Sequence, residues 1–345
     1  MPLNVLGIET SCDETAIGVV IDGRRMHSNI IASQVDLHSP YGGVVPEIAS
    51  RQHIRDLIPV LEKAMAGAGL ALEDLDVVAV TYGPGLAGSL ITGLNAAKAI
   101  AFTLDVPLIG VNHLEGHIYA SWLGQPDPAE DPGFPLACLI ASGGHTDLIL
   151  MEGHGQYRLL GRTRDDAAGE AFDKAARILG LGFPGGPEIQ RVSQGAAGTE
   201  RLPRAWLKGT LDFSFSGVKT ALLHLAQERG IYPPGANDIG EAETGVLVRE
   251  LAAAFQESAV DVMTAKLQDM ADRYKARGLI LAGGVAANAR LRQEVARRSR
   301  LPVIVPEPVL CTDNGAMIAA CGYYQYQRGE QFGFDLDIDP GLPLG

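Results

Sequence analysis

Two histidines and a glutamate lie within five residues of one another in the stretch VNHLEGHIYA at 111–120. On a helix each residue turns about 100° around the axis, so His113 and His117 would share one face and could chelate one metal ion. Glu115 would lie roughly 200° from His113. In the zinc-protease string H-E-x-x-H the glutamate directly follows the first histidine and reaches the metal-bound water. The spacing therefore favours a histidine pair without a peptidase base, or a solvated or core pair without a metal.

A histidine pair needs a further ligand to hold a transition metal. The stretch CTDNGAMIA at 311–319 offers Asp313, either as that ligand or, with Thr312, as part of a helix cap. Two histidines and one carboxylate suit iron(II) or zinc. The residues alone leave both roles of Asp313 open.

Several turns carry the other candidate chemistry. IETSCDET at 8–15 gathers Glu9, Asp13 and Glu14, which could supply a base or form an ordinary polar turn. Glycine pairs follow apolar runs in ASGGHT, FPGGPEI and LAGGVAAN, where backbone amides could approach an anion closely. Ligands of α/β proteins gather at strand ends, so these repeated turns favour nucleotide binding. The sequence contains no P-loop motif G-x-x-x-x-G-K-[ST].

The elements that must position these residues alternate between apolar strands and amphipathic helices, which predicts an α/β protein. Residues 5–22 and 136–153 both read as strand, polar turn, strand, and suggest an internal repeat of about 130 residues. Helices are expected at 45–69, 165–181 and 244–274. We predict two domains, 1–130, completed by a helix at 311–330, and 131–310, joined by the proline-rich stretch 124–135.

Bulk composition narrows the partners. The net charge of the 345 residues is −13, a poor composition for gripping nucleic acid unaided. The stretch RLRQEVARRSR at 290–300 has five arginines, and is either a solvated helix face or the best candidate for phosphate contact. Four scattered cysteines and no signal peptide indicate a reducing cytoplasm. The uncharged run 77–97 holds four glycines, which favours a strand, a turn and a helix over a membrane span.

Taken together, these stretches are more specific than any one of them. IETSCDET, NHLEGH, ASGGHT, DDAAGEAFDK, FPGGP, FSFSGVKTAL, LAGGVAAN and CTDNGAMIA follow one another from residue 8 to residue 319. In this order they resemble the bacterial tRNA N6-adenosine threonylcarbamoyltransferases, a family formerly called O-sialoglycoprotein endopeptidases. The resemblance implies two duplicated actin-like (RNase H-like) domains with an interdomain nucleotide and metal cleft.

By resemblance, His113, His117 and Asp313 hold one divalent metal, iron(II) or zinc. The resemblance also implies a set of residues that bind ATP, ADP or the adenylate intermediate: Ile140, Ala141, Ser142, Gly143, Gly144, Asp173, Gly186 and Asn288. Some relatives carry an acidic residue where this chain has Gln190. Asp13 is our hypothetical catalytic base, with Glu14 and Glu9 as rivals.

The implied reaction transfers the threonylcarbamoyl group of L-threonylcarbamoyl-adenylate to N6 of adenosine 37, in tRNAs that read codons starting with A, and releases AMP. The implied partners are tRNA, a catalytically silent actin-like paralogue and a small P-loop ATPase, in the cytoplasm and without a membrane. Two other classes stay open. One is a metal-dependent glycoprotein peptidase, and the other is a non-catalytic actin-like ATPase scaffold.

Overall fold

The computed structural model describes residues 2–124, 131–233 and 241–344, and the chain forms two compact units. Unit 1 comprises residues 1–131, 153–156 and 306–345, and unit 2 comprises residues 132–152 and 157–305. The chain therefore leaves unit 1, builds unit 2 and returns to complete unit 1. The expected linker 124–135 falls largely outside the described residues.

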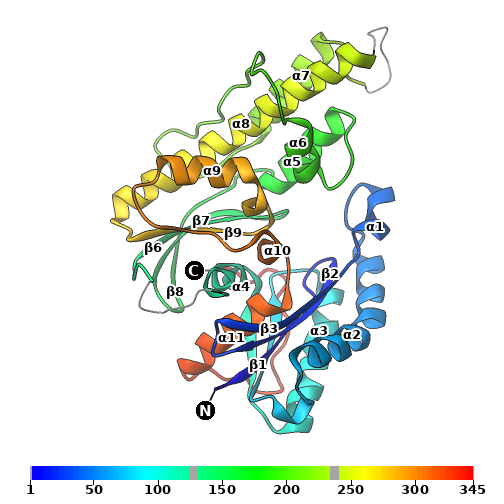
Figure 1. The fold of residues 1–345 in the computed structure, drawn as a ribbon, viewed down its shortest axis with the longest axis vertical. Helices are drawn as coiled ribbons and strands as arrows, with labels where there is room; N and C mark the ends of the chain where they lie inside the picture. Colours follow the sequence, from blue (N-terminus) through cyan, green and yellow to red (C-terminus); the bar gives the residue numbers. More distant parts are fainter. Residues whose placement is uncertain (1, 125–130, 234–240, 345) are drawn as a thin grey trace. The chain divides into compact units, whose positions relative to one another are not determined.

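Each unit contains one five-stranded sheet (Figure 1), and the two sheets have the same topology. The first has the order β3-β2-β1-β4-β5, with bounds β1 Asn4–Glu9, β2 Glu14–Ile21, β3 Arg25–Ser33, β4 Val77–Gly83 and β5 Leu108–Asn112. The second has the order β10-β9-β6-β7-β8, with bounds β6 Leu136–Ala141, β7 Thr146–Gly153, β8 Gln156–Arg162, β9 Gly278–Ala282 and β10 Val303–Ile304. In both, a central strand pairs antiparallel with the next strand and parallel with a later one. The predicted α/β class and internal repeat are confirmed.

Helices separate these strands along the chain. The helices of unit 1 are α1 Val35–His38, α2 Pro46–Ala68, α3 Ala87–Leu104, α4 His113–Tyr119, α10 Pro308–Cys311 and α11 Gly315–Gln327, with short 3-10 turns η1 Ser39–Tyr41, η2 Leu72–Asp74 and η3 Ala120–Trp122. The helices of unit 2 are α5 Ala168–Ile178, α6 Gly185–Val192, α7 Ser216–Glu228, α8 Glu241–Tyr274 and α9 Ala289–Arg298, with the 3-10 turn η5 Gly284–Ala287.

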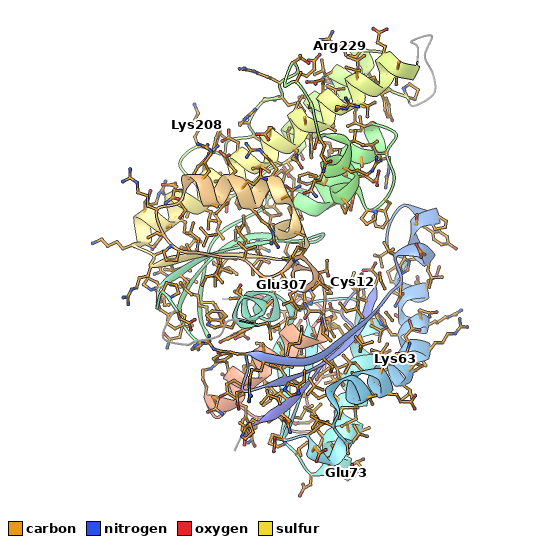
Figure 2. All side chains as sticks on the ribbon, in the orientation of Figure 1. Cys12, Lys63, Glu73, Lys208, Arg229 and Glu307 are labelled. Atoms are coloured by element: carbon orange, nitrogen blue, oxygen red, sulfur yellow. The ribbon has the colours of Figure 1, made fainter. Side chains whose placement is uncertain are left out.

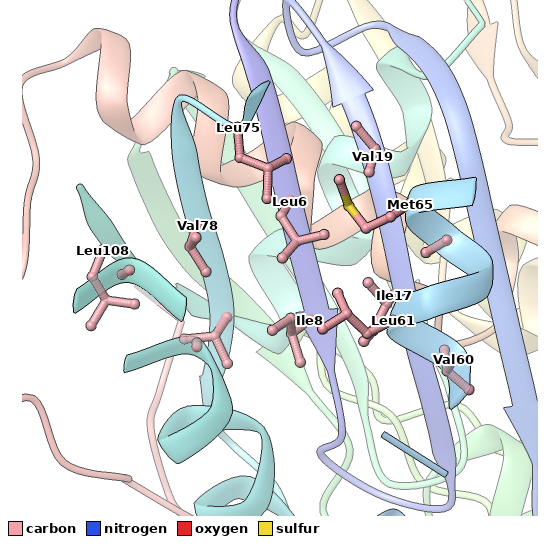
Figure 3. Close-up of a cluster of buried hydrophobic side chains, with 14 of the residues drawn as sticks. Leu6, Ile8, Ile17, Val19, Val60, Leu61, Met65, Leu75, Val78 and Leu108 are labelled. Atoms are coloured by element: carbon pink, nitrogen blue, oxygen red, sulfur yellow. The ribbon is translucent and has the colours of Figure 1, made fainter. Parts of the chain in front are cut away.

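The core of unit 1 lies between its sheet and helices α2 and α3. Figure 3 shows Leu6, Ile8 and Ile17 of the sheet facing Leu61 and Met65 of α2. Each such side chain contributes about 1.5–3 kcal/mol by leaving water. By length and composition α3 could cross a membrane, but Leu94 on it packs into this core. The run 77–97 is the predicted strand, turn and helix.

Helix α11 packs against β1 and β2 with almost no space between the backbones. A β-carbon built on Gly315 would lie 2.2 Å from the backbone nitrogen of Gly18, and one on Gly7 would lie 2.2 Å from the carbonyl oxygen of Gly315. These positions therefore require glycine, because any side chain would push the helix off the sheet. Asp313 lies two residues before this contact, so the contact sets its place.

The C-terminal segment 331–344 returns along the edge of the same sheet. Phe332 N donates to the carbonyl of Leu108 at 2.9 Å, and Asp339 N donates to the carbonyl of Tyr82 at 2.8 Å. Farther along, the side-chain amide of Asn112 donates to the carbonyl of Pro343 at 3.0 Å. The end of the described chain thus reaches the residue that precedes α4.

We expect Gly315→Ala to lower the free energy of unfolding by about 1–3 kcal/mol, because the added methyl group overpacks a backbone contact. Chemical denaturation monitored by circular dichroism measures this change. Gly43→Ala is the matched control, since a β-carbon there has nothing within 4 Å. Equal stability of the two variants would mean that α11 can shift without cost.

Candidate metal centre and ligand-binding turns

The two histidines of NHLEGH lie on α4, a helix of seven residues that starts directly after β5. Asn112 caps this helix, because its side-chain oxygen accepts from the backbone nitrogens of Leu114, at 2.9 Å, and Glu115, at 3.4 Å. His113 and His117 are one turn apart, with ring centroids 4.7 Å from each other. The cap and the end of β5 together orient both rings.

Asp313 meets this pair from a distant part of the sequence. Its Oδ1 lies 3.5 Å from Nε2 of His113 and 3.2 Å from Nε2 of His117. One ligand atom from each residue lies within 4.8 Å of the others, so the three could hold a metal ion. The cap of α11 is Asn314, whose side chain accepts from Met317 N at 2.9 Å. The cap role that the sequence left open for Asp313 therefore belongs to Asn314. The role of metal ligand remains for Asp313.

The environment of His117 fits a bound cation. Its side chain is only 1% exposed, and within the part of the chain that the structure describes neither ring nitrogen makes an aligned hydrogen bond, although Nε2 lies 3.2 Å from Oδ1 of Asp313. An unpaired buried polar nitrogen costs about 1–3 kcal/mol. A metal at Nε2 would supply the missing partner, and two imidazoles with one carboxylate suit iron(II) or zinc.

Glu9 supports the site from behind His113. Its Oε2 lies 3.0 Å from Nδ1 of His113, and the fully buried carboxylate also accepts from Ser11 N and from the hydroxyl of Thr81. A carboxylate on Nδ1 holds the proton there and turns the lone pair of Nε2 toward Asp313. Glu9 therefore orients a ligand, and these contacts occupy it too fully for the base role considered for it.

Charge in this cluster shifts the pKa of each member. Burial tends to lower the pKa of His113, but the charges of Asp313 and Glu9 raise that pKa to about 9. Burial tends to raise the pKa of Asp313, but His113 and His117 lower it to about 2. Burial also works against the charge on Glu9, and its pKa is still lowered by His113. His113 thus carries a proton at neutral pH that a metal must displace.

Glu115 is held away from the histidines. Its Oε2 accepts from Nε2 of Gln325 at 2.7 Å, and its Oε1 lies 3.8 Å from Arg328. The predicted position on the far side of the helix is confirmed. A peptidase mechanism that uses Glu115 as its base is incompatible with these contacts.

The polar turn between β1 and β2 carries the other candidate bases. Burial, followed by the charges of Asp313 and Asp13, raises the pKa of Glu14 to about 9, so Glu14 is mostly protonated at neutral pH. The turn itself is fixed by His53, whose Nε2 lies 3.0 Å from the carbonyl of Cys12, and by Gln34 N, which donates to the carbonyl of Asp13. Asp13 and Glu14 are adjacent in this turn, so Asp13 stays our hypothetical base and Glu14 its rival.

The predicted nucleotide-binding residues all lie in unit 2, and the segments that carry them touch one another. A β-carbon on Gly283, which has a φ of +85°, would lie 2.5 Å from the carbonyl of Ala141. The turn that follows Ile140 and Ala141 at the end of β6 also contacts α5, where Gly169 N donates to the carbonyl of Ser142 at 3.0 Å. The end of β6, the end of β9 and the start of α5 therefore meet at one place.

Gly143 and Gly144 form the exposed tip of that turn. Neither has a positive φ, so the turn does not need glycine for a left-handed conformation. A β-carbon on either would meet nothing within 4 Å. The protein itself leaves room for a side chain here, and only a ligand lying on the turn would exclude one.

Asp173 joins α5 to the FPGGP turn. Its Oδ1 accepts from Gly185 N at 2.7 Å, and burial raises its pKa. Gly185 packs against the backbone of Asp173, whereas Gly186 borders open space. The predicted pair Asp173 and Gly186 thus lies together at the start of α6.

Asn288 starts α9 and is already engaged. Its side-chain oxygen caps the helix at Leu291 N, 3.0 Å away, and its Nδ2 donates to Oε1 of Gln256 at 2.8 Å. Oε1 of Gln190 accepts from Ala289 N at 2.6 Å, and the carboxylate of an acidic side chain could accept the same bond. Sequence reasoning missed Gln256 and the cap at Asn112. The preference for asparagine at helix starts could have found the cap, whereas no local pattern marks Gln256.

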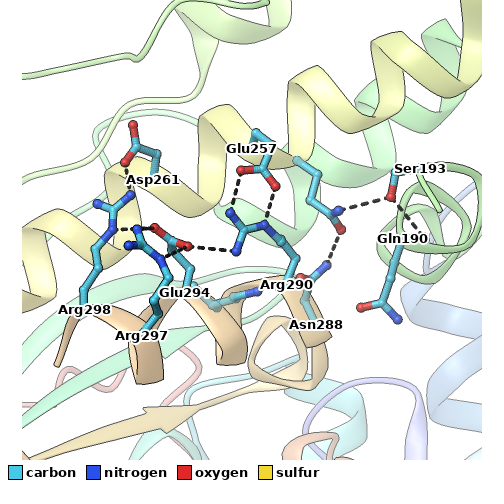
Figure 4. A network of polar contacts seen from close by, with 11 residues as sticks. Gln190, Ser193, Glu257, Asp261, Asn288, Arg290, Glu294, Arg297 and Arg298 are labelled. Carbon is cyan, nitrogen blue, oxygen red and sulfur yellow. Dashed lines mark hydrogen bonds and ion pairs between the residues drawn. The ribbon is translucent and has the colours of Figure 1, made fainter. Parts of the chain in front are cut away.

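Two groups of predicted surface charges are paired. Asp165 and Asp166 do not begin α5, since Asp165 accepts from Phe215 N at 2.8 Å and Asp166 pairs with Lys174 at 2.7 Å. The arginines of α9 are engaged as well (Figure 4). Arg297 and Arg298 both bind Glu294 at 2.5 Å. The basic stretch is therefore less positive than its five arginines suggested.

Comparison with known proteins identifies relatives over the whole chain. A protein-family model described as tRNA N6-adenosine threonylcarbamoyltransferase matches residues 25–320. Proteins of that name from Thermomicrobium roseum and Dehalococcoides mccartyi are 56% and 54% identical, and each alignment covers 99% of this chain and 96% and 99% of the relative. A protein of that name from Bacillus cereus is 47% identical over 99% of this chain and 96% of its own length.

Solved structures match the fold at low identity. Component A of the (R)-2-hydroxyglutaryl-CoA dehydratase of Acidaminococcus fermentans superposes with a TM-score of 0.53 at 13% identity, covering 94% of this chain and 99% of that one. HypF of T. kodakarensis superposes with a TM-score of 0.60 at 15% identity, covering 95% of this chain and 50% of that one. These matches establish the actin-like ATPase fold.

We expect the apparent affinity for Zn²⁺ to rise about tenfold per pH unit between about pH 6 and 8, because one proton must leave His113. In the metal-free protein the free energy of unfolding instead falls as the pH rises. The stability contributed by the raised pKa of His113 is fully present below its unfolded value of 6.5 and is lost as the pH rises through about 9. Melting temperatures with and without Zn²⁺ across this range measure both effects. A metal-induced shift that does not change with pH would contradict the displaced proton.

We expect Glu9→Gln to weaken metal binding by about 10–100-fold, because a side-chain amide can donate to Nδ1 of His113 and force the proton onto Nε2. Equilibrium dialysis with Zn²⁺ measures the affinity. The exposed Glu73, labelled in Figure 2, provides the control variant Glu73→Gln. Unchanged affinity in Glu9→Gln would show that the carboxylate does not orient the ligand.

Proposed function

The chain belongs to the tRNA N6-adenosine threonylcarbamoyltransferase family, and we propose that it makes N6-threonylcarbamoyladenosine at position 37 of tRNAs that read codons starting with A. The threonylcarbamoyl group comes from L-threonylcarbamoyl-adenylate, and AMP is released. The observation that carries the proposal is the buried cluster of His113, His117 and Asp313 in a chain of this family. The position of Glu115 argues against a peptidase, and the complete ligand set argues against a silent scaffold.

The reaction sets three tasks for the protein. The N6 amine of adenosine is conjugated to the purine ring and is a poor nucleophile, so it must be aligned and must lose its proton. Negative charge on the carbonyl and phosphate oxygens must also be stabilised. We assign the proton transfer to Asp13, because Glu9 is held by His113.

The adenylate is assigned to unit 2. Its phosphate lies on the backbone amides of the turn 140–144, where Gly143 and Gly144 leave open space. Asp173 keeps one carboxylate oxygen on Gly185 N and offers the other to a ribose hydroxyl. Gly186 gives close access beside it, and the second hydrogen of the Asn288 amide is directed to the ligand.

The metal is assigned to unit 1, held by Nε2 of His113, Nε2 of His117 and a carboxylate oxygen of Asp313. Iron(II) is the proposed ion, and zinc is the alternative for the same ligand set. Such an ion supplies positive charge that binds and polarises oxygen. The protein contributes the orientation of the ligands through Glu9 and Asn112.

Assembly completes the proposal. An acidic chain repels a polyanion on average, so we assign part of the tRNA affinity to partner proteins. The proposed partners are a catalytically silent actin-like paralogue and a small P-loop ATPase, in the cytoplasm. ATP or ADP competes with the adenylate for the turns of unit 2.

The test is transfer of the threonylcarbamoyl group to an unmodified tRNA transcript, measured by nucleoside analysis. His117→Ala should remove both bound metal and product, whereas His27→Ala, at an exposed position on β3, should remove neither. Gly144→Val should fold normally and weaken adenylate binding by calorimetry far more than Gly43→Val. Full product formation by His117→Ala, or unchanged adenylate affinity in Gly144→Val, would refute the respective assignment.

A further inference from the structure

One loop of unit 2 exposes an aromatic ring among cations. Residues 201–210, RLPRAWLKGT, contain Arg201, Arg204 and Lys208 and no acidic residue, in a chain whose net charge is −13. Trp206 lies between these cations and is 44% exposed. An exposed indole among cations combines an aromatic face with positive charge in one place.

The loop is held firmly although it has no regular secondary structure. Helix α8 anchors it at three points along the helix. Ser258 donates to the carbonyl of Pro203 at 2.6 Å, Asp261 accepts from Arg204 at 2.9 Å, and Lys266 donates to the carbonyls of Leu207 and Thr210 at 3.2 and 2.8 Å. Lys266 is only 4% exposed, so a nearly buried charge serves to fix the loop backbone.

The loop is continuous with the basic end of α9. Asp261 uses its second oxygen to bind Arg298 at 2.5 Å, so Arg204 and Arg298 lie on either side of one carboxylate. Arg297 and Arg298 share Glu294, as Figure 4 shows. Asp261 and Glu294 thus pair with Arg204, Arg297 and Arg298, and the loop adds the cations Arg201 and Lys208. Lys208 lies alongside α8 in Figure 2.

This combination matches the chemistry of unpaired RNA. A fixed aromatic ring among cations offers a stacking surface to a base and positive charge to the neighbouring phosphates, whereas the bases of a duplex are not free to stack. The immediate neighbours of Trp206, Ala205 and Leu207, are apolar, and the cations Arg204 and Lys208 lie two residues away on either side. The local excess of positive charge favours the polyanion.

We propose that the 201–210 loop and the end of α9 form an RNA-binding surface on which Trp206 stacks against an unpaired base of the tRNA. Arg201 and Lys208 contact phosphates beside that base. This inference rests on the proposed function, because it supplies the site where this chain engages the single-stranded part of its tRNA substrate. Arg297 and Arg298 of α9 are partly neutralised by Glu294 and Asp261. The end of α9 therefore adds to the charge of the loop and does not form the surface alone.

The two tryptophans of the chain make a direct test possible. Trp122 is 3% exposed, so only Trp206 is positioned to meet an added RNA. We expect an unmodified tRNA transcript to quench the tryptophan fluorescence of the full chain at about 50 mM salt, where phosphate contacts are strong. A single-stranded RNA should quench it as well, and a duplex should not. Trp206→Leu should abolish the quenching.

Binding measurements separate stacking from charge. Trp206→Ala should weaken tRNA binding roughly 5- to 150-fold without changing its salt dependence, and Trp206→Phe should restore most of the affinity. Lys208→Ala should flatten the slope of log affinity against log salt by about 0.7–0.9. Phe334→Ala is the matched control, because Phe334 is 50% exposed but lies near Asp335 and Asp337.

The outcomes distinguish this inference from the proposed function. In the transfer assay Trp206→Ala should raise KM for tRNA and leave kcat and adenylate affinity unchanged. The inference is overturned if the chain transfers the group but two results fail. These are quenching of Trp206 fluorescence by tRNA and weaker tRNA binding by the Trp206→Ala variant. Quenching by a partner protein but not by tRNA would overturn it too and make the loop a protein interface. Trp206-dependent binding of tRNA in a chain without transfer would support the surface and refute the activity.

Discussion

The contact between α11 and the first two strands is the constraint on which the metal centre depends. Three glycines, Gly7, Gly18 and Gly315, let the backbones meet, so α11 has one position on the sheet. Asp313 lies two residues before the first turn of α11, and the histidines follow β5 of the same sheet. Metal ligation tolerates only small displacements, on the order of tenths of an ångström. Backbone packing on the sheet is therefore what makes three distant residues one site.

The same arrangement explains how unit 1 accommodates charge in its interior. Glu9 is fully buried and the side chain of Asp313 is 19% exposed, which would be costly for isolated carboxylates. His113 lies between them and, when protonated, attracts both with a single positive charge. A divalent ion would take over that compensation and satisfy His117 in the same place. The proton on His113 therefore offsets one of the two carboxylate charges, whereas a divalent ion beside neutral imidazoles would offset both.

Much of this could be predicted from the sequence, because hydrophobic periodicity and turn residues are local signals. The repeated hairpins, the long helix α8 and the far-side position of Glu115 follow from such signals. The role of Glu9 could not be predicted, since it depends on a contact with His113 across 104 positions. The pairing of Arg297 and Arg298 with Glu294 was not predicted either. The sequence shows a run of five arginines, but it does not show the side-chain rotamers that bring two of them onto one carboxylate.

The path of the chain through the two units has a consequence for biosynthesis. His113 and His117 are translated before unit 2, and roughly 200 residues separate His117 from Asp313. At translation rates of about 5–20 residues per second, the histidines are synthesised about 10–40 s before their third ligand. Until then the glycine face of β1 and β2 is uncovered, and Asn112 lacks Pro343. A nascent chain therefore cannot complete the ligand set until unit 2 and Asp313 have been synthesised, long after the two histidines.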